Sequence, residues 1–198
     1  KSNKLVDEYC FGAGTVLDNQ LVIYDVYGSI AHARMLEKIG IINKNEFHKL
    51  KKCLIKIIDL YKNGDFEVGQ EDEDVHTKIE NYLTEKLGDL GKKIHTGRSR
   101  NDQVLVDLRL YSKEKVIDLA VSINQLIDTF VEFAKKYEFI PMPGYTHMQK
   151  AMPSSAGMWA GSFAEQLLDQ VKILKSVYKF NDQSSLGSGA AYGVSLSI

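Results

Sequence analysis

The chain has 198 residues, of which 44% are hydrophobic, so it can bury a core and is not expected to be disordered. Lysine and arginine total 25 and aspartate and glutamate total 26, which leaves a formal charge of −1 at pH 7. This balance argues against a general nucleic-acid or membrane-surface binder, because such proteins carry a basic excess. No signal peptide is recognised, and no apolar run reaches the roughly 20 residues that span a bilayer.

The two cysteines, Cys10 and Cys53, form no CxxC pattern, so no zinc or redox motif is recognised. A reduced, cytoplasmic setting is the simplest interpretation of so few cysteines. The chain has only three prolines, two of them in one short stretch. Because so few residues break helices, long helices are expected.

Helical patterns fill the first half of the chain. Three such patterns, each ended by a glycine, cover residues 21–39, 44–63 and 74–87. Asn43 stands three residues before Glu46, which is the arrangement of a capping box at a helix start. The acidic run at residues 70–74 precedes the third pattern, and its ordinary interpretation is a solvated helix start.

The second half predicts two long helices. Residues 102–137 carry the longest apolar pattern, a rod of roughly 50 Å that is typical of a helical bundle. After a loop, Pro153 is expected to open the second helix. Small residues on that helix would let a neighbouring helix approach closely, and they are Gly157, Ala160, Gly161 and Ala164.

No segment alternates with the period of a strand, so the predicted fold class is all-α. Two long helices cannot close a core alone. Other chains are therefore expected to complete the bundle, and the protein is expected to continue beyond Ile198. Apolar faces left open, such as the stripe through Phe163 and Leu167, predict self-association.

Three polar clusters interrupt the helices. The first comprises Asp25, Ser29 and His32, which share one helix face. An ordinary polar stripe is the favoured interpretation of this face, with a site as the alternative. His76, on a later helix, is expected to pair with Glu80 one turn further on.

The second cluster is the stretch "HTGRSRNDQ". Gly97 permits a sharp turn, and Asn101 or Asp102 is expected to cap the long helix. The backbone N–H groups of a helix start, with Arg98 and Arg100 nearby, suit a carboxylate or phosphate. A charged and well-capped helix start fits the residues equally well. The spacing of a phosphate-binding P-loop is absent.

The third cluster is "GYTHMQ", in the loop between the two long helices. His147 lies there, and an imidazole suits proton transfer because it titrates near neutral pH. A structural histidine is the alternative interpretation. The sequence contains no nucleophile elbow, Rossmann fingerprint or HExxH motif.

Four stretches fall in the order and spacing of the argininosuccinate lyases: "EDEDVHTKIENYL", "KKIHTGRSRNDQV", "PGYTHMQKAMP" and "SLGSGAAYG". The whole chain resembles the first part of those enzymes. "HTGRSRNDQV" is specific to them, because adenylosuccinate lyases, fumarases and aspartases of the same superfamily differ there. The resemblance implies reversible elimination of argininosuccinate to arginine and fumarate, in arginine biosynthesis, with no metal or organic cofactor.

The resemblance also implies roles for individual residues. The substrate-binding residues would be Ser99, Arg100, Asn101 and Thr146. His147 would take part in proton transfer, either as the direct base or as an organiser. His76 matches a family histidine near the site that has no settled catalytic role.

The fold that the resemblance implies is fumarase/aspartase-like. A small helical N-terminal domain is expected over residues 1–100, followed over residues 101–198 by the first long helices of a central helical bundle. In the family, four chains pack their bundles together, and each active site collects segments from three of them. The expected partner is thus another copy of the chain in a homotetramer, with neither nucleic acid nor membrane.

Two departures from the family pattern matter. Many members carry a substrate-binding serine shortly before the first helix, where this chain has Gly12, Ala13, Gly14 and Thr15. Either Thr15 replaces that serine or the contact is absent. The family's mobile loop, with its catalytic serine, would lie beyond Ile198, so these 198 residues alone are expected to be inactive or nearly so.

Three other functions are alternatives to argininosuccinate cleavage. One is a non-catalytic structural member of the family, as in the lens. Another is a superfamily lyase acting on a different fumarate-yielding substrate, such as adenylosuccinate, which the motif from Arg98 to Asp102 disfavours. The last is a plain helical assembly module, in which loss of His147 would leave any catalysis intact.

Overall fold

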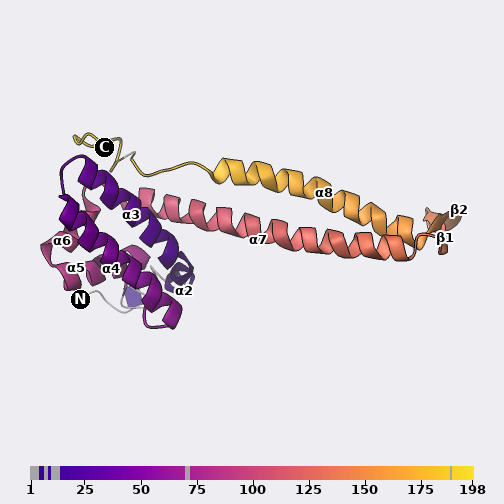
Figure 1. Ribbon diagram of the computed structural model, residues 1–198, viewed down its shortest axis with the longest axis horizontal. Coiled ribbons are helices and arrows are strands. Elements are labelled where there is room, and N and C mark those ends of the chain that lie inside the picture. The colour runs from indigo at the N-terminus through magenta and orange to yellow at the C-terminus, as the bar shows by residue number, and fades with distance from the viewer. Residues whose placement is uncertain (1–4, 7–8, 10–13, 70–71, 188) are drawn as a thin grey trace. The chain divides into compact units, whose positions relative to one another are not determined.

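A computed structural model describes residues 5–6, 9, 14–69, 72–187 and 189–198 (Figure 1). The chain divides into two compact units. The first contains residues 1–111 and 184–198, and the second contains residues 112–183. The division falls inside one long helix, α7 (Arg100–Lys136).

The first unit is helical. Its elements in chain order are α2 (Gly14–Asp18), η1 (Asn19–Leu21), α3 (Val22–Lys38), α4 (Lys44–Asn63), α5 (Val75–Leu87), α6 (Asp89–Lys92), η2 (Lys93–His95) and the first turns of α7. Neighbouring helices α3 and α4 pack side by side, as do α5 and α6 (Figure 1). The three helices predicted over this part of the chain are thus confirmed, with bounds that agree to within a few residues.

Local sequence signals set the ends of these helices. The Asn43 side chain accepts hydrogen bonds from the N–H groups of Asn45 and Glu46, and the Glu46 carboxylate accepts from the Asn43 N–H, so the predicted capping box is present. Gly64 ends α4 with φ of 80°, a left-handed conformation that favours glycine. The Asp74 side chain caps α5 by accepting from the Thr77 N–H.

The core of the first unit comes from the inward stripes of α3, α4 and α5. Its largest fully buried apolar side chains are Val22, Val26, Leu36, Ile42, Leu50, Leu54, Ile57, Val75, Leu83 and Ile94. The Asn19 side-chain amide ties the extended segment after α4 to this core, because it donates to the Val68 carbonyl and accepts from the Val68 N–H. The packed core therefore holds α3, α4, α5 and the segment after α4 together.

The second unit is a helical hairpin. It contains the rest of α7, the strands β1 (Pro141–Thr146) and β2 (Gln149–Ser155), and α8 (Ala156–Asn181). The two helices run antiparallel, joined by the strands (Figure 1). The rings of Phe130 and Phe163 stack at 5.5 Å between centroids, and Lys113 pairs with Asp182 at 2.6 Å. The predicted pair of long helices is thus confirmed.

The expectation that no strand is present was wrong. β1 and β2 pair antiparallel, and Pro143 lies opposite Pro153 in their register. Pro153 therefore sits in a strand rather than opening α8, which begins at Ala156 with the Ser155 hydroxyl accepting from the Met158 N–H. Both strands of a two-stranded ribbon are edge strands, which tolerate proline and need no buried face. The usual sequence signals of a strand, alternating apolar residues and a lack of proline, are therefore missing from these two strands.

The predicted close approach of α8 to a neighbouring helix is confirmed at Gly157. A Cβ atom there would lie 2.4 Å from the Ala134 carbonyl oxygen and 2.7 Å from the Glu138 Cα. At Gly161, one turn later, a Cβ would meet nothing within 4 Å. Close packing thus requires a glycine at position 157 of α8 but not at position 161.

This difference gives a matched pair of variants. Gly157→Ala should lower the free energy of unfolding by roughly 1–3 kcal/mol, because backbone atoms must move to admit the methyl group. Gly161→Ala should raise it by about 0.5–1 kcal/mol, because alanine favours the helix and space is free. Denaturant unfolding followed by circular dichroism measures both. Equal effects at the two positions would contradict the described helix contact.

None of the helices in the described part of the chain combines the length and apolar composition that a bilayer crossing requires.

Candidate functional site

The stretch "HTGRSRNDQ" forms the start of α7. The Ser99 hydroxyl accepts from the Asn101 N–H at 3.3 Å, and the Asp102 carboxylate accepts from the Ser99 N–H at 2.8 Å. The first helical bond runs from the Gln103 N–H to the Ser99 carbonyl. The cap is therefore Ser99, with Asp102 as its reciprocal partner, and the expectation of a cap at Asn101 or Asp102 placed the helix start two or three residues late.

The two arginines of this stretch point to different environments. Arg98 is 5% exposed and its Nη1 donates to the Ser29 hydroxyl at 3.2 Å, so it serves the interior rather than an anion at the surface. Arg100 is exposed. Its guanidinium pairs with Glu73 and, at 3.3 Å, with Asp74, and it donates to the Thr77 hydroxyl at 2.8 Å. A carboxylate ligand at Arg100 has to compete with these acidic partners.

The acidic run before α5 is only partly solvated. Glu73 is exposed, but Asp72 is 7% exposed and accepts from the Gly69 N–H and from Lys78. Asp74 is the helix cap, which confirms the helix-start part of the expectation. Gln70 and Glu71 lie outside the described residues.

A group of buried polar side chains lies behind the start of α7. This buried charge cluster comprises Asp25, Ser29, His76, Arg98 and Asp107, each at most 5% exposed. The Ser29 hydroxyl donates to Asp25 Oδ1 at 3.0 Å, and His76 Nδ1 makes a short hydrogen bond to Asp25 Oδ2. The favoured interpretation of the α3 face as an ordinary polar stripe was therefore wrong, because these side chains form a buried hydrogen-bond network.

The expected pairing of His76 with Glu80 was wrong. His76 pairs with Asp25 from α3, whereas Glu80 faces His95 with 3.9 Å between the Glu80 carboxylate and His95 Nδ1. His32 does not join the cluster directly; its Nε2 lies 3.0 Å from the Thr96 carbonyl. Burial and the charge of Arg98 lower the pKa of His32 to about 4, so near neutral pH the ring is uncharged and donates this bond.

Burial and neighbouring charges separate the two carboxyl groups of the cluster. Burial opposes ionisation of Asp25, but the His76 hydrogen bond and the charge of Arg98 prevail and lower its pKa. Burial, and then the negative charge of Asp25, raise the pKa of Asp107 to about 9. One carboxyl group is thus held ionised and the other protonated at neutral pH.

Asp25, His76 and Asp107 are also the group of three in the described residues whose ligand atoms lie close enough, within 4.8 Å of one another, to hold a metal ion. Two carboxylates and an imidazole are a donor set that divalent metals accept. Here Nδ1 of His76 carries the proton that it donates to Asp25, which leaves no lone pair there, and the neighbouring Arg98 repels a cation. The arrangement therefore favours a protonated network over a metal centre.

The glycine-rich tail packs on the start of α7. The Ala190 N–H donates to the Gly97 carbonyl at 3.2 Å, and the Ser185 hydroxyl donates to the Asp102 carbonyl at 2.9 Å. Gly97 has φ of 72°, and a Cβ there would lie 3.3 Å from the Leu196 side chain. Two of the stretches singled out in the sequence, near residues 97 and 190, therefore meet in the first unit, which sequence spacing did not reveal.

Thr146 and His147 belong to the second unit, at the tip of the β1–β2 hairpin. Thr146 pairs with Gln149, so His147 and Met148 form a two-residue turn. Their φ angles are 49° and 60°, which glycine and asparagine adopt more readily, and both side chains are exposed. The turn therefore presents the imidazole to solvent.

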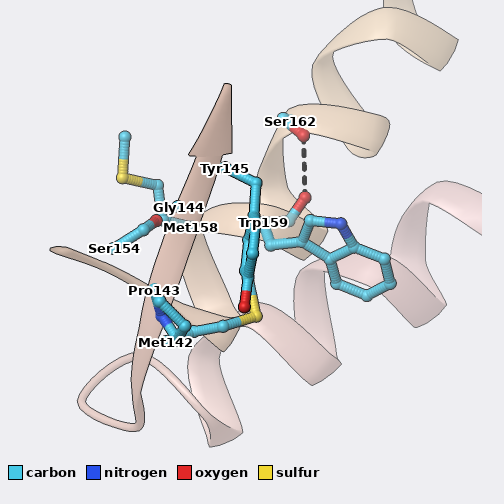
Figure 2. Close-up of a pocket in the computed structure, with 8 residues that line it drawn as sticks. All are labelled: Met142, Pro143, Gly144, Tyr145, Ser154, Met158, Trp159 and Ser162. Atoms are coloured by element: carbon cyan, nitrogen blue, oxygen red, sulfur yellow. Dashed lines mark hydrogen bonds between the residues drawn. The ribbon is translucent and has the colours of Figure 1, made fainter. Parts of the chain in front are cut away.

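A hollow of about 520 Å³ lies beside the same hairpin (Figure 2). Its walls come from the strands and the first turns of α8, and they are Met142, Pro143, Gly144, Tyr145, Ser154, Met158, Trp159 and Ser162. The Ser162 hydroxyl donates a hydrogen bond to the Trp159 carbonyl at 2.7 Å. The lining is mostly apolar and includes neither Thr146 nor His147.

The described structure thus distributes the predicted site residues over two units. Ser99, Arg100 and Asn101 lie at the surface of the first unit, with His76 buried behind them. The side chain of Thr15, like Gly12 and Ala13, lies outside the described residues.

Long helices of this kind pack into bundles, which build ligand sites from side chains on facing helices. The family model described as "Lyase" matches residues 6–198, and the chain therefore belongs to this lyase family, that of fumarase and aspartase. Within the family, it is 42% identical over 193 residues to the argininosuccinate lyase of Parabacteroides distasonis. It is also 42% identical over 196 residues to that of Thermotoga neapolitana.

Each of these comparisons covers 98% of this chain but 43% and 48% of the two relatives, so the chain spans less than half of their length. Solved structures share the fold. A variant of EDDS lyase with bound fumarate matches all of the chain and 39% of its own, with a TM-score of 0.80 and 22% identity. The fumarate lyase:delta crystallin of Brucella melitensis matches 95% of the chain and 47% of its own, with a TM-score of 0.78 and 19% identity.

Proposed function

We propose that the protein containing this chain is an argininosuccinate lyase, which reversibly eliminates argininosuccinate to arginine and fumarate in a cytoplasmic pathway of arginine biosynthesis. The observation that carries the proposal is the 42% identity to curated argininosuccinate lyases over 98% of the chain. Elimination needs a base for the proton beside a carboxylate, donors for the anionic intermediate, and an acid for the leaving nitrogen.

The start of α7 supports the anion-binding part of this proposal. Ser99 and Asn101 are accessible at the first turn of a 37-residue helix, where backbone N–H groups and the helix dipole favour carboxylates. Arg100 would bind substrate by exchanging its contacts with Glu73 and Asp74 for a substrate carboxylate. These three residues would bind the succinyl part.

The hairpin tip supports the proton-transfer part. His147 is exposed and held at a positive φ angle by a two-residue turn, a strained arrangement that often marks functional positions. Thr146, beside it at the end of β1, would bind a second substrate carboxylate. His76 is buried and bound to Asp25, so we assign it a role in positioning rather than contact with substrate.

In this proposal, residues 1–100 form the N-terminal domain and residues 101–198 begin the central bundle. Four chains would assemble, and each active site would combine segments from three chains. No metal or organic cofactor takes part. The exposed apolar side chains of the second unit support assembly with other copies; they include Leu119, Leu126, Phe133, Trp159, Leu168 and Ile173.

The assembly claim has its own test. Light scattering should show a multimer, and replacing both Leu126 and Ile173 by glutamate should weaken association by at least about tenfold, since each exposed leucine or isoleucine contributes more than 1 kcal/mol when buried. The control is Lys172→Glu, which changes a residue next to Ile173 on α8 that forms an exposed ion pair with Asp169. A monodisperse monomer at all concentrations would contradict the assembly.

The enzymatic test is fumarate release from argininosuccinate, followed by ultraviolet absorbance, with adenylosuccinate offered in parallel. Turnover of argininosuccinate alone supports the proposal. Turnover of adenylosuccinate alone would support another lyase of the family. A folded, assembled protein that cleaves neither would support the non-catalytic structural alternative.

A further inference from the structure

Asp107 is the least satisfied polar group of the buried charge cluster. It lies on α7, is 1% exposed, and neither of its carboxyl oxygens has a hydrogen-bond donor among the described residues. His76 Nδ1 is 3.7 Å from Asp107 Oδ2, but its N–H is already directed to Asp25. A buried carboxylate without donors is strongly disfavoured, whereas a protonated carboxyl group is neutral and supplies its own donor.

Asp25 is in the opposite situation. It accepts from Ser29 and from His76, and Arg98 lies close enough to favour its ionised form. Its oxygens and those of Asp107 approach within 4.8 Å. Two carboxyl groups so close together avoid carrying two negative charges by sharing one proton.

Packing explains why Asp107 reaches this position. Gly28 on α3 faces α7, and a Cβ there would lie 3.2 Å from Val106 and 3.5 Å from Asp107 Oδ1. The glycine thus lets α7 approach α3 closely enough to bring Asp107 against Asp25. The same approach fixes the first turn of α7, which carries Ser99.

We propose that Asp107 carries a proton at neutral pH and donates it to Asp25, so that this carboxyl–carboxylate pair seats Arg98 and positions the helix start at Ser99–Asn101. The pair is one negative charge matched to one guanidinium. Ionisation of Asp107 would add a second buried negative charge and make the position of Arg98 less well fixed. Asp107 is thus a positioning residue that acts through Arg98.

The charged and titratable groups around the pair come from every element packed against it. They are Asp18 from α2, His32 from α3, His76 and Glu80 from α5, Arg98 from the preceding turn, and Asp102 from α7. Arg98 is the buried cation among them, and His32 is uncharged at neutral pH. The surroundings therefore stabilise one ionised carboxyl group, not two.

The sign of the pH dependence follows from this protonation. The pKa of Asp107 is raised to about 9 in the fold and returns to its ordinary acidic value on unfolding. Its stabilising contribution is therefore fully present in acid, decreases as the pH rises above the unfolded pKa, and is lost by the time the pH has passed about 9. Asparagine has the same shape as aspartic acid and keeps an N–H donor without any charge. The Asp107→Asn variant should therefore not lose this stability as the pH rises.

The test compares Asp107→Asn with Asp107→Leu and with Asp169→Asn, an exposed control. We expect the Tm of the original protein to fall between pH 6 and about pH 9, and the Asp107→Asn curve to be flatter and higher by roughly 5 °C at pH 8. Asp107→Leu should lose stability, because the donor to Asp25 is gone. A lower Tm for Asp107→Asn at every pH would overturn the proposal.

Infrared spectroscopy observes the proton directly and does not depend on activity. A protonated-carboxyl band should be present at pH 7 and absent in Asp107→Asn, but unaffected in Asp169→Asn. Absence of the band at pH 7 in the original protein would overturn the proposal. So would tight binding of zinc or cobalt that Asp107→Asn abolishes, since a metal requires the ionised group.

The positioning claim also rests on the proposed lyase function. In the fumarate assay, Asp107→Asn should keep kcat within about threefold and lose any alkaline fall in kcat that begins near the Asp107 pKa. Asp107→Leu should lower kcat at least tenfold. Equal rates for both variants would overturn the positioning role even if the infrared band is present.

Discussion

Replacing His147 by asparagine should lower kcat for argininosuccinate cleavage about 10²–10⁴-fold, the loss expected when a positioned acid–base group is removed. Asparagine is chosen because it adopts the positive φ of the turn at least as readily as histidine does. The hairpin should therefore keep its shape while the titrating ring is lost. KM should change much less than kcat, because Thr146 and the start of α7 remain available to bind substrate.

The control is His48→Asn, which changes an exposed histidine on α4. It should leave kcat unchanged. Steady-state kinetics and thermal unfolding of the three proteins, measured on the same preparations, separate a catalytic effect from a folding defect. If His147→Asn keeps full kcat while the original protein is active, His147 is not part of the proton transfer.

Removing Asp25 should cause the largest loss of stability. In Asp25→Ala, His76 and Ser29 lose their shared buried acceptor, and Arg98 loses the nearby negative charge that offsets its own. Breaking a buried charge pair in this way costs about 3–5 kcal/mol. We expect the lower end, about 3 kcal/mol, because Asp107 can then ionise beside Arg98. Denaturant unfolding at pH 7 measures the loss.

Asp169→Ala is the matched control, since Asp169 pairs with Lys172 on the exposed surface of α8 at 2.7 Å. Its effect should stay below about 1 kcal/mol. The double variant Asp25→Ala/Asp107→Asn should lose more than the two single effects added together, because Asp107 can no longer compensate. A loss below 1 kcal/mol for Asp25→Ala would show that the buried charge cluster is not coupled as described.

Local signals allowed much of the fold to be predicted. The capping box at Asn43 and the glycine at Gly64 are set by residues within a few positions of one another, so the sequence displays them directly. The β hairpin was not predicted because its two strands have no buried face and contain prolines. A strand shows alternating apolar and polar residues in its sequence only where one face of the sheet is buried.

The contacts among the candidate site residues could not be predicted from the sequence. Asp25 and His76 are 51 positions apart, and only the packing of α3 against α5 joins them. Arg98 and Arg100 look alike in the motif, yet a helix begins between them, so one arginine turns inward and the other outward. Sequence alone could not show which of the two would be free to meet an anion.

Fumarate release from argininosuccinate, by the purified gene product that contains this chain, is the decisive measurement of the proposed lyase function. We expect turnover of argininosuccinate, none of adenylosuccinate, and loss of that turnover in His147→Asn. A folded and assembled protein that releases no fumarate from argininosuccinate would contradict it.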